Sequence, residues 1–240
     1  MKFHMLASGS KGNAFILEKN DTKLLIDCGT TKRYFLNSLN LLELSIEDFD
    51  GILITHNHSD HIKQINIFKD HPFVFSPEQL NIDHHFVYAY EPFMIDDFEI
   101  FPLPTSHDAE VSVGYVISDR EHKLVYMTDT GYVKEEHLQY MYGADYIVME
   151  SNHDPELLMK TKRPYYIKQR ILSDSGHLSN DDAGEVLGKI VTSATKEIIL
   201  AHLSEEANRE DIALDTVSKY LNGYKGKLKV GKQYEILSSD

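Results

Sequence analysis

The sequence predicts an α/β protein in which two sheets pack together and helices lie outside them. Short aliphatic runs of strand length recur along the whole chain. Strands come first and then alternate with segments of helical periodicity, and this order is repeated in each half. No stretch rich in glycine, proline or serine divides the chain, so residues 1–240 are expected to form one domain.

The predicted strands are short, aliphatic and bounded by turn residues. They are 2–7, 14–19, 23–27, 51–55, 98–103, 113–118, 123–128, 145–150 and 197–202. The predicted helices place apolar residues three and four positions apart, and they are 32–42, 134–142, 180–192 and 209–220. The polar and acidic run after Ser179 is typical of a helix start.

The composition, 42% hydrophobic and 26% charged, is that of a soluble globular protein. No run approaches the ~20 apolar residues of a membrane span, and the first seven residues do not resemble a signal peptide. Because Cys28 is the single cysteine, no internal disulfide can form and the cytoplasm is the expected location. The net charge of −14 disfavours an extended non-specific duplex binder, although a local basic strip could still meet phosphate.

Three of the thirteen histidines gather in THNHSDH, residues 55–61, directly after a predicted strand. Histidines two positions apart can face one ion from a non-helical turn, so His56 and His58 could hold one metal. Asp60 and His61 could reach a second metal beside it. The spacing differs from the helical His-Glu-x-x-His of zinc proteases, in which the histidines are four apart.

Further donors follow other predicted strands and complete a set that two metals would need. They are His107, Asp129 and His202. Imidazole and carboxylate ligands together suit zinc, manganese or iron. The sequence therefore predicts two divalent metal ions per chain as cofactors.

The THNHSDH segment resembles the H-x-H-x-D-H signature of the metallo-β-lactamase superfamily, and the order of the later donors resembles its remaining motifs. The opening strands and Asp27 also fit. The resemblance implies a single-domain four-layer αβ/βα sandwich with the site at one edge of the sheets. By the same resemblance the first ion is bound by His56, His58 and His107, the second by Asp60, His61 and His202, and Asp129 bridges the two.

Four other segments resemble the YycJ/WalJ-like branch of this superfamily. They are SGSKGN (8–13), ESNHD (150–154), LSDSGHLSN (172–180) and AHLSEEAN (201–208). This resemblance implies a metal-dependent hydrolase that is a nuclease, with 5′-to-3′ exonuclease activity and DNA as the favoured substrate. The branch is related to the PhnP-like phosphodiesterases.

Two metals roughly 3.5–4 Å apart can share a hydroxide that attacks phosphorus, and they offset the charge of the transition state. Asp60 and His177 are the predicted catalytic residues. His177 would donate a proton to the leaving oxygen, because Gly176 beside it permits a tight turn near a ligand. Alternatively, His177 merely precedes the helix cap Ser179.

Three more residues are expected near this site. Asp27 would orient the histidine turn through a hydrogen bond, or else it is an ordinary turn residue at a strand end. His153 would contact substrate, although capping of the next helix explains much of its motif. Asn13 lies in a glycine-rich loop that either faces substrate or is a simple hairpin, since it lacks the phosphate-loop pattern.

The segment KTKRPYYIKQR, residues 160–170, is basic and contains two tyrosines and no acid. Its candidate phosphate contacts are Lys160, Lys162, Arg163, Lys168 and Arg170. Positive charge interleaved with aromatic rings suits single-stranded nucleic acid, in which bases stack and phosphates pair. The alternative is a solvated amphipathic helix that starts after Pro164.

The first hypothesis is therefore a dinuclear phosphodiesterase whose partner is a nucleic acid or another phosphodiester, and not a membrane. The second is a small-molecule hydrolase on the same metals, such as a cyclic phosphodiesterase, a thioesterase or a lactonase. The third is a binding protein with a vestigial site, against which the complete ligand set argues.

Overall fold

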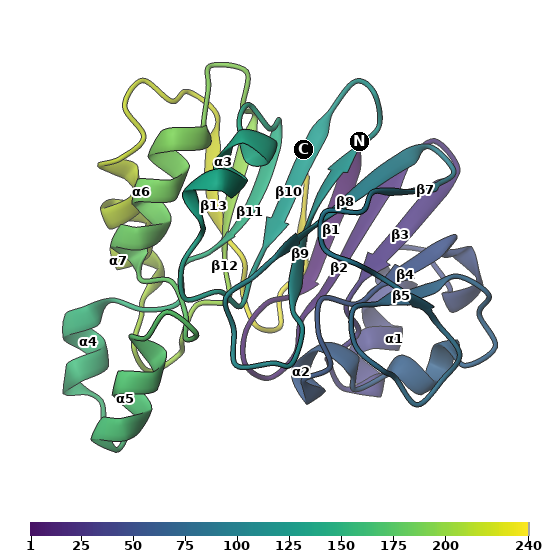
Figure 1. Ribbon diagram of the computed structural model, residues 1–240, viewed down its shortest axis with the longest axis horizontal. Helices are drawn as coiled ribbons and strands as arrows, with labels where there is room; N and C mark the ends of the chain where they lie inside the picture. The colour runs from purple at the N-terminus through teal and green to yellow at the C-terminus, as the bar shows by residue number, and fades with distance from the viewer. Residues whose placement is uncertain (240) are drawn as a thin grey trace. The chain divides into compact units, whose positions relative to one another are not determined.

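The computed structural model describes residues 1–239 and divides into two compact units. The first comprises Met1–Pro102, Ala109–Val113 and the C-terminal segment from Lys232. The second comprises Leu103–Asp108 and Gly114–Gly231. Figure 1 follows the chain through these segments by colour. The expectation of one domain stays a prediction.

The first unit contains a sheet in the order β14-β1-β2-β3-β4-β5-β6. Its strands are β1 (Lys2–Ala7), β2 (Ala14–Lys19), β3 (Thr22–Ile26), β4 (Gly51–Leu53), β5 (Val74–Ser76), β6 (His85–Phe86) and β14 (Leu237–Ser238). The pairs from β14 to β3 are antiparallel, and those from β3 to β6 are parallel. Strands β7 (Phe93–Ile95) and β8 (Phe98–Pro104) form an antiparallel hairpin.

Helix α1 (Lys32–Leu41) packs on this sheet through Phe35 and Leu39, which share one buried cluster with strand residues such as Leu25 and Ile52. Cys28 belongs to the same cluster, as expected of a small core residue. Thr31 caps the helix by accepting a hydrogen bond from the Tyr34 amide. The short helix α2 (Ser59–Ile62) and the 3₁₀ turns Ile46–Asp48 and Ile65–Phe68 complete the unit.

The second unit contains the strands β9 (Val113–Ser118), β10 (Lys123–Met127), β11 (Tyr146–Glu150), β12 (Glu197–Ala201) and β13 (Lys227–Val230). Strand β9 pairs with β10 antiparallel, and β10 to β13 are parallel neighbours. Parallel strands are usually buried on both faces, and β10 to β12 are accordingly continuous apolar runs. Their carboxyl ends lie at a common edge.

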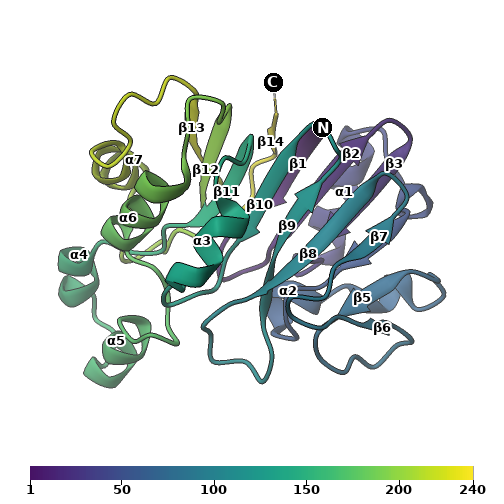
Figure 2. The same cartoon turned by 45° about the horizontal axis from the view of Figure 1, so that its top comes forward.

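The helices of the second unit are α3 (Glu135–Met141), α4 (Pro155–Lys160), α5 (Tyr165–Ile171), α6 (Asn180–Ile190) and α7 (Glu210–Ser218). Helix α6 contacts α3 and α7, and α7 contacts β13; Figure 1 shows α6 and α7 side by side. Ser179 and Asp182 form a capping box at the start of α6. Figure 2 shows α4 and α5 as adjacent short helices.

Every strand and helix predicted from the sequence is present in the structure. Outside the predicted ranges lie α2, α4, α5, β5, β6, β7, β13 and β14, and all are short. Of these, α4 is the helix expected after the His153 motif, and α5 begins directly after Pro164, as the alternative interpretation of the basic segment expected. Helices of one or two turns and strands of two to four residues contain too few repeats of the hydrophobic pattern to be recognised. Within residues 1–239, no helix has the length and apolar character that crossing a bilayer requires.

Candidate functional site

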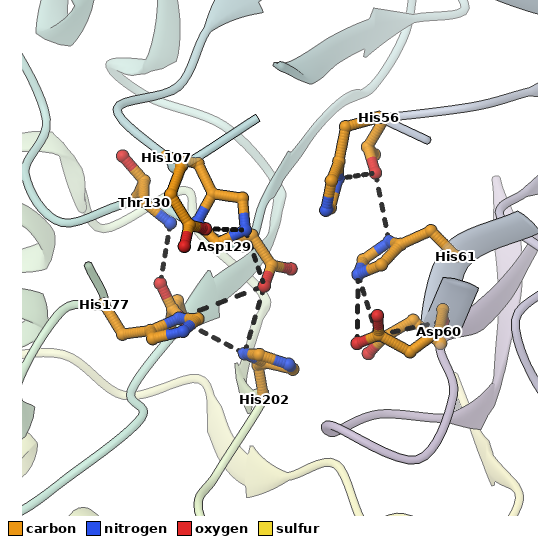
Figure 3. Close-up of polar contacts among 12 residues, drawn as sticks. His56, Asp60, His61, His107, Asp129, Thr130, His177 and His202 are labelled. Carbon is orange, nitrogen blue, oxygen red and sulfur yellow. Dashed lines mark hydrogen bonds and ion pairs between the residues drawn. The ribbon is translucent and has the colours of Figure 1, made fainter. Parts of the chain in front are cut away.

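The histidine turn of the first unit lies between β4 and α2. The rings of His56 and His58 are 4.6 Å apart, and those of His56 and His61 are 4.1 Å apart, measured between centroids. His56 and His61 are buried, whereas His58 and Asp60 are half-buried. Figure 3 shows Asp60 beside His61, and their Oδ2 and Nε2 atoms are 3.7 Å apart. The turn therefore gathers three imidazoles and one carboxylate.

Asp27 fixes the orientation of His61. It follows β3 in the left-handed region, with φ of 60°, which costs roughly 1–2 kcal/mol in a residue other than glycine. Its Oδ2 lies 2.8 Å from Nδ1 of His61, and its Oδ1 accepts a hydrogen bond of 2.9 Å from the Thr55 amide. Because Nδ1 is held by a carboxylate, His61 presents the lone pair of Nε2.

The glycine-rich loop 8–13 supports the same histidine. Asn13 is buried, its amide Nδ2 lies 3.0 Å from Nε2 of His61, and its Oδ1 accepts from the Gly9 amide at 2.9 Å. A Cβ on Gly29 would lie 1.6 Å from the carbonyl oxygen of Asp60, so only glycine fits there. The structure thus places Asn13 against a candidate metal ligand inside the unit, and not on an open surface.

Two candidate residues of the second unit, Asp129 and His202, follow β10 and β12, the parallel strands on either side of β11. The register pairs Met127 with Met149 and Glu150 with Ala201. Asp129 and His202, just beyond those pairs, therefore lie near Glu150 at the carboxyl edge, where open α/β sheets bind ligands. The backbone of both residues lies in the left-handed region, with φ of 53° for Asp129 and 56° for His202. Such strain in non-glycine residues clusters at functional sites.

Glu150 organises this edge, and the sequence analysis did not select it. Its Oε1 lies 2.8 Å from Nδ1 of His177 and 2.9 Å from Nδ1 of His202, and its Oε2 accepts from the Thr130 amide at 2.8 Å. Burial opposes ionisation, but the charge and hydrogen bonds of the two histidines prevail and lower the pKa of Glu150 to about 2. The available signal was an acidic residue that ends a buried strand.

Asp129 is surrounded by imidazoles of the same unit. Its Oδ1 lies 3.5 Å from Nδ1 of His202 and 3.9 Å from both Nδ1 of His177 and Nε2 of His107. Figure 3 shows His177 and His202 directed toward the Asp129 carboxylate. Burial lowers the pKa of His107 and so favours the neutral imidazole, which is the form that binds metals.

His177 is positioned by the end of α5. Its amide donates to the carbonyl of Ile171 at 3.0 Å. A Cβ on Gly176 would lie 2.3 Å from the carbonyl oxygens of Arg170 and Ile171. Glycine is therefore required at 176 for a different reason from the tight turn that was expected. The loop passes so close to the end of α5 that a side chain would not fit.

His153 is 1% exposed and follows β11. Within residues 1–239, neither ring nitrogen has a hydrogen-bond partner, and burial lowers the pKa of His153 to about 4. Asp154 caps α4 by accepting from the Leu157 amide, which accounts for part of the motif. Buried nitrogens of this kind usually bind water or a ligand. This agrees with substrate contact by His153, which stays a prediction.

A buried amide network explains the other motif residues around His153. Asn180 Oδ1 accepts from the Ser151 hydroxyl at 2.6 Å and from Asn208 Nδ2 at 2.9 Å. Asn152 Nδ2 donates to the carbonyl of His202 at 2.8 Å. The ESNHD, HLSN and SEEAN segments are therefore bonded to one another and hold the loop that carries His202.

The basic strip is less uniform than its sequence suggests. Lys168 is 8% exposed, and its Nζ donates to the carbonyls of Met159 and Thr161, which ties α5 to α4. Arg163 pairs with Glu206, and Arg170 pairs with Asp108. Lys160 and Lys162 are exposed, as are Tyr165 at 64% and Tyr166 at 69%.

Each unit thus offers donors that fit divalent transition metals. The ligand atoms are imidazole nitrogens and carboxylate oxygens. In each unit one histidine donates Nδ1 to a buried carboxylate, His61 to Asp27 and His202 to Glu150. This is the second contact that metal-binding histidines almost always make.

Comparisons with known proteins agree with this fold and these donors. Residues 22–203 match the beta-lactamase superfamily domain. The chain is 36% identical to exodeoxyribonuclease YycJ of Bacillus anthracis, over 100% of this chain and 96% of that protein. It is 34% identical to exodeoxyribonuclease WalJ of Streptococcus pneumoniae, over 98% and 93%. The metallo-β-lactamase fold protein YhfI of Bacillus subtilis superimposes with a TM-score of 0.73 at 17% identity, over 99% of both chains.

The protein is therefore a metal-dependent hydrolase with the metallo-β-lactamase fold. The chain belongs to the beta-lactamase superfamily and, within it, to the YycJ/WalJ-like branch. The predicted family and fold class are confirmed.

Proposed function

We propose that this hydrolase is a dinuclear phosphodiesterase that degrades nucleic acid from an end, with DNA as the favoured substrate. The observation that carries the metal site is the pair of carboxylate-oriented histidines, His61 on Asp27 and His202 on Glu150. The full-length similarity to proteins named exodeoxyribonuclease supports the choice of substrate.

The proposed ligands keep the assignment expected from the superfamily signature. The first ion would be held by His56, His58 and His107 and the second by Asp60, His61 and His202, and Asp129 would serve both. When bound, such a pair of ions activates water and neutralises charge on a phosphoryl oxygen. The same donor chemistry suits zinc, manganese or iron.

The chain's own groups supply the proton for the leaving oxygen. Glu150 holds Nδ1 of His177 at 2.8 Å, so Nε2 is the nitrogen left to exchange a proton with substrate. The same buried carboxylate fixes the direction of the imidazole ring, which a proton donor in a fixed position needs. His177 is accordingly the general acid in this proposal.

Helices α4 and α5 provide the proposed contact surface for a nucleic-acid strand. Lys160, Lys162 and Arg163 offer exposed or half-exposed charge for phosphates, and Tyr165 and Tyr166 offer exposed rings for stacking. Arg170 keeps free guanidinium nitrogens beyond its bond to Asp108. Lys168 no longer belongs to this proposed surface, because its amine is bonded to two backbone carbonyls.

The proposal is tested by digestion of end-labelled single- and double-stranded DNA and RNA with added Mn²⁺ or Zn²⁺. We expect stepwise shortening from one end, inhibition by a chelator, and no digestion by Asp129→Ala. Bis-p-nitrophenyl phosphate and a thioester are assayed beside the oligonucleotides. Turnover of the thioester alone would reject the nuclease and favour a small-molecule hydrolase.

A further inference from the structure

Glu78 is a buried carboxylate close to the histidine turn of the first unit. It follows β5 and is 5% exposed. Its Oε2 accepts a hydrogen bond of 2.7 Å from the Asn57 amide, and its Oε1 accepts one of 3.1 Å from the Val111 amide. The Ser76 hydroxyl donates to the Glu78 carbonyl at 2.8 Å and accepts from its amide at 3.2 Å, which fixes the turn.

No basic side chain within residues 1–239 pairs with Glu78. Burial of an ionised carboxylate without a cation is costly, so the two amide donors must offset much of that cost. A residue that served only packing could be apolar at lower cost. The carboxylate at this position is therefore explained by the backbone amides that it binds.

One of the two amides that Glu78 binds belongs to the turn that carries two proposed ligands of the first ion, and the other belongs to residues 109–113 of the same unit. Asn57 stands between His56 and His58, and Val111 follows His107 by four residues in the sequence. The Val113 amide also donates to the Thr55 carbonyl at 3.0 Å, which joins the same two segments a second time. One carboxylate thus joins the turn that carries His56 and His58 to residues 109–113.

We infer that Glu78 is a positioning residue for the first metal ion. It holds the backbone of the His56–His58 turn, and its negative charge favours a divalent cation nearby. This inference rests on the proposed metal site. Glu78 is not one of the proposed ligands, and each of its oxygens accepts a backbone hydrogen bond.

The test is the affinity of Glu78→Gln for Zn²⁺, measured by competition with a chromophoric chelator. Glutamine keeps the shape but carries no charge, and its NH₂ group would face a backbone N–H. We expect binding of one ion to weaken by roughly 10–100-fold, the usual effect of losing a residue that supports a ligand, while the other is unchanged. His58→Ala identifies which binding step belongs to the first ion. The d–d spectrum of the Co²⁺-loaded variant should change in that same step.

Glu197→Gln is the matched control. Glu197 is a buried carboxylate of β12 that pairs with Lys229 at 2.8 Å, away from the strand ends that carry ligands. Its loss should lower thermal stability and leave both affinities unchanged. Equally weakened metal binding in the two variants would mean general destabilisation and would overturn the inference.

The remaining outcomes also separate the inference from the proposed function. Wild-type affinity and an unchanged Co²⁺ spectrum in a folded Glu78→Gln variant overturn the role of Glu78 alone. If that variant does not fold, Ser76→Ala decides, because it loosens the turn and keeps the charge. The affinity of Ser76→Ala for the first ion is then expected to be several-fold lower, and an unchanged affinity overturns the inference. A wild-type protein that binds no metal rejects the proposed site and, with it, this role.

Discussion

Glu150 accepts a hydrogen bond from Nδ1 of His177 at 2.8 Å, and the same carboxylate oxygen lies 2.9 Å from Nδ1 of His202. One buried carboxylate therefore orients both the proposed general acid and a proposed metal ligand. Glu150→Gln should impair both functions, since the amide cannot accept as strongly from two imidazoles. A variant of His177 alone should impair only proton transfer.

His177→Ala is expected to keep both metals and to lose roughly 10²–10⁴-fold in kcat, the usual contribution of a general acid. The loss should be large for a dinucleotide, whose nucleoside leaving group needs a proton. It should shrink for a nitrophenyl ester, because nitrophenolate leaves without protonation. Metal content by elemental analysis and kcat on the two substrates check this. Loss of a metal, or undiminished activity on both, would contradict the assignment.

Asp129→Ala is expected to lower the occupancy of both metal positions. Asp129 is the proposed bridge, and its Oδ1 lies within 4 Å of three imidazoles. The wild-type protein should carry close to two transition-metal ions per chain, and His58→Ala should affect chiefly one. Elemental analysis after dialysis against metal-free buffer measures both. A variant that kept one ion at full occupancy would show that Asp129 is not shared.

The double variant Lys160→Gln/Lys162→Gln is expected to weaken binding of single-stranded DNA and to flatten its salt dependence. Removing one lysine–phosphate pair on a single strand lowers the slope of log K against log salt by about 0.7, so removing two should lower it by about 1.4. Turnover of bis-p-nitrophenyl phosphate should be unchanged. Fluorescence anisotropy over a range of salt concentrations gives the slope.

Lys168→Met is the control for that double variant. The Lys168 amine binds two carbonyls and staples α4 to α5. Its replacement should lower the melting temperature and leave the salt slope as it is. A slope that falls with Lys168→Met, but not with the double variant, would place the phosphate contacts elsewhere.

The elements with long hydrophobic patterns and the metal motifs were predictable, because both are encoded locally. Two histidines and an aspartate within a few residues of a strand end need no tertiary information to suggest a metal site. Glu150 and Glu78 were not selected in this way, although Glu150 ends a predicted strand. Each acts through residues that are distant in sequence.

The charge of a residue could be predicted from the sequence, but its partner could not. Lys168 has the same sequence signal as Lys162, yet one amine is buried against carbonyls and the other side chain is exposed. Gly176 was correctly picked out as unusual, but the reason is contact with the end of α5 and depends on packing. Pro164 divides 155–171 into two short pieces, so the sequence suggested helices there without fixing their bounds.

His153 should make the protein less stable in mild acid. Burial lowers its pKa from 6.5 to about 4 in the folded chain. Between these values the unfolded state binds a proton at this residue and the folded state does not, so the free energy of unfolding falls as the pH falls from about 6.5 to about 4. The full effect is on the order of 3 kcal/mol.

The contribution of His153 is isolated by comparing wild type with His153→Gln under metal-free conditions. Urea unfolding at several pH values between 7 and 4 gives the free energy for each protein. Other histidines with a lowered pKa, such as His4 and His137, contribute equally to both curves. The wild-type curve should therefore fall more steeply than that of the variant below pH 6.5, and the two should become parallel below about pH 4. Parallel curves over the whole range would mean that His153 takes up its proton as readily in the folded chain as in the unfolded one.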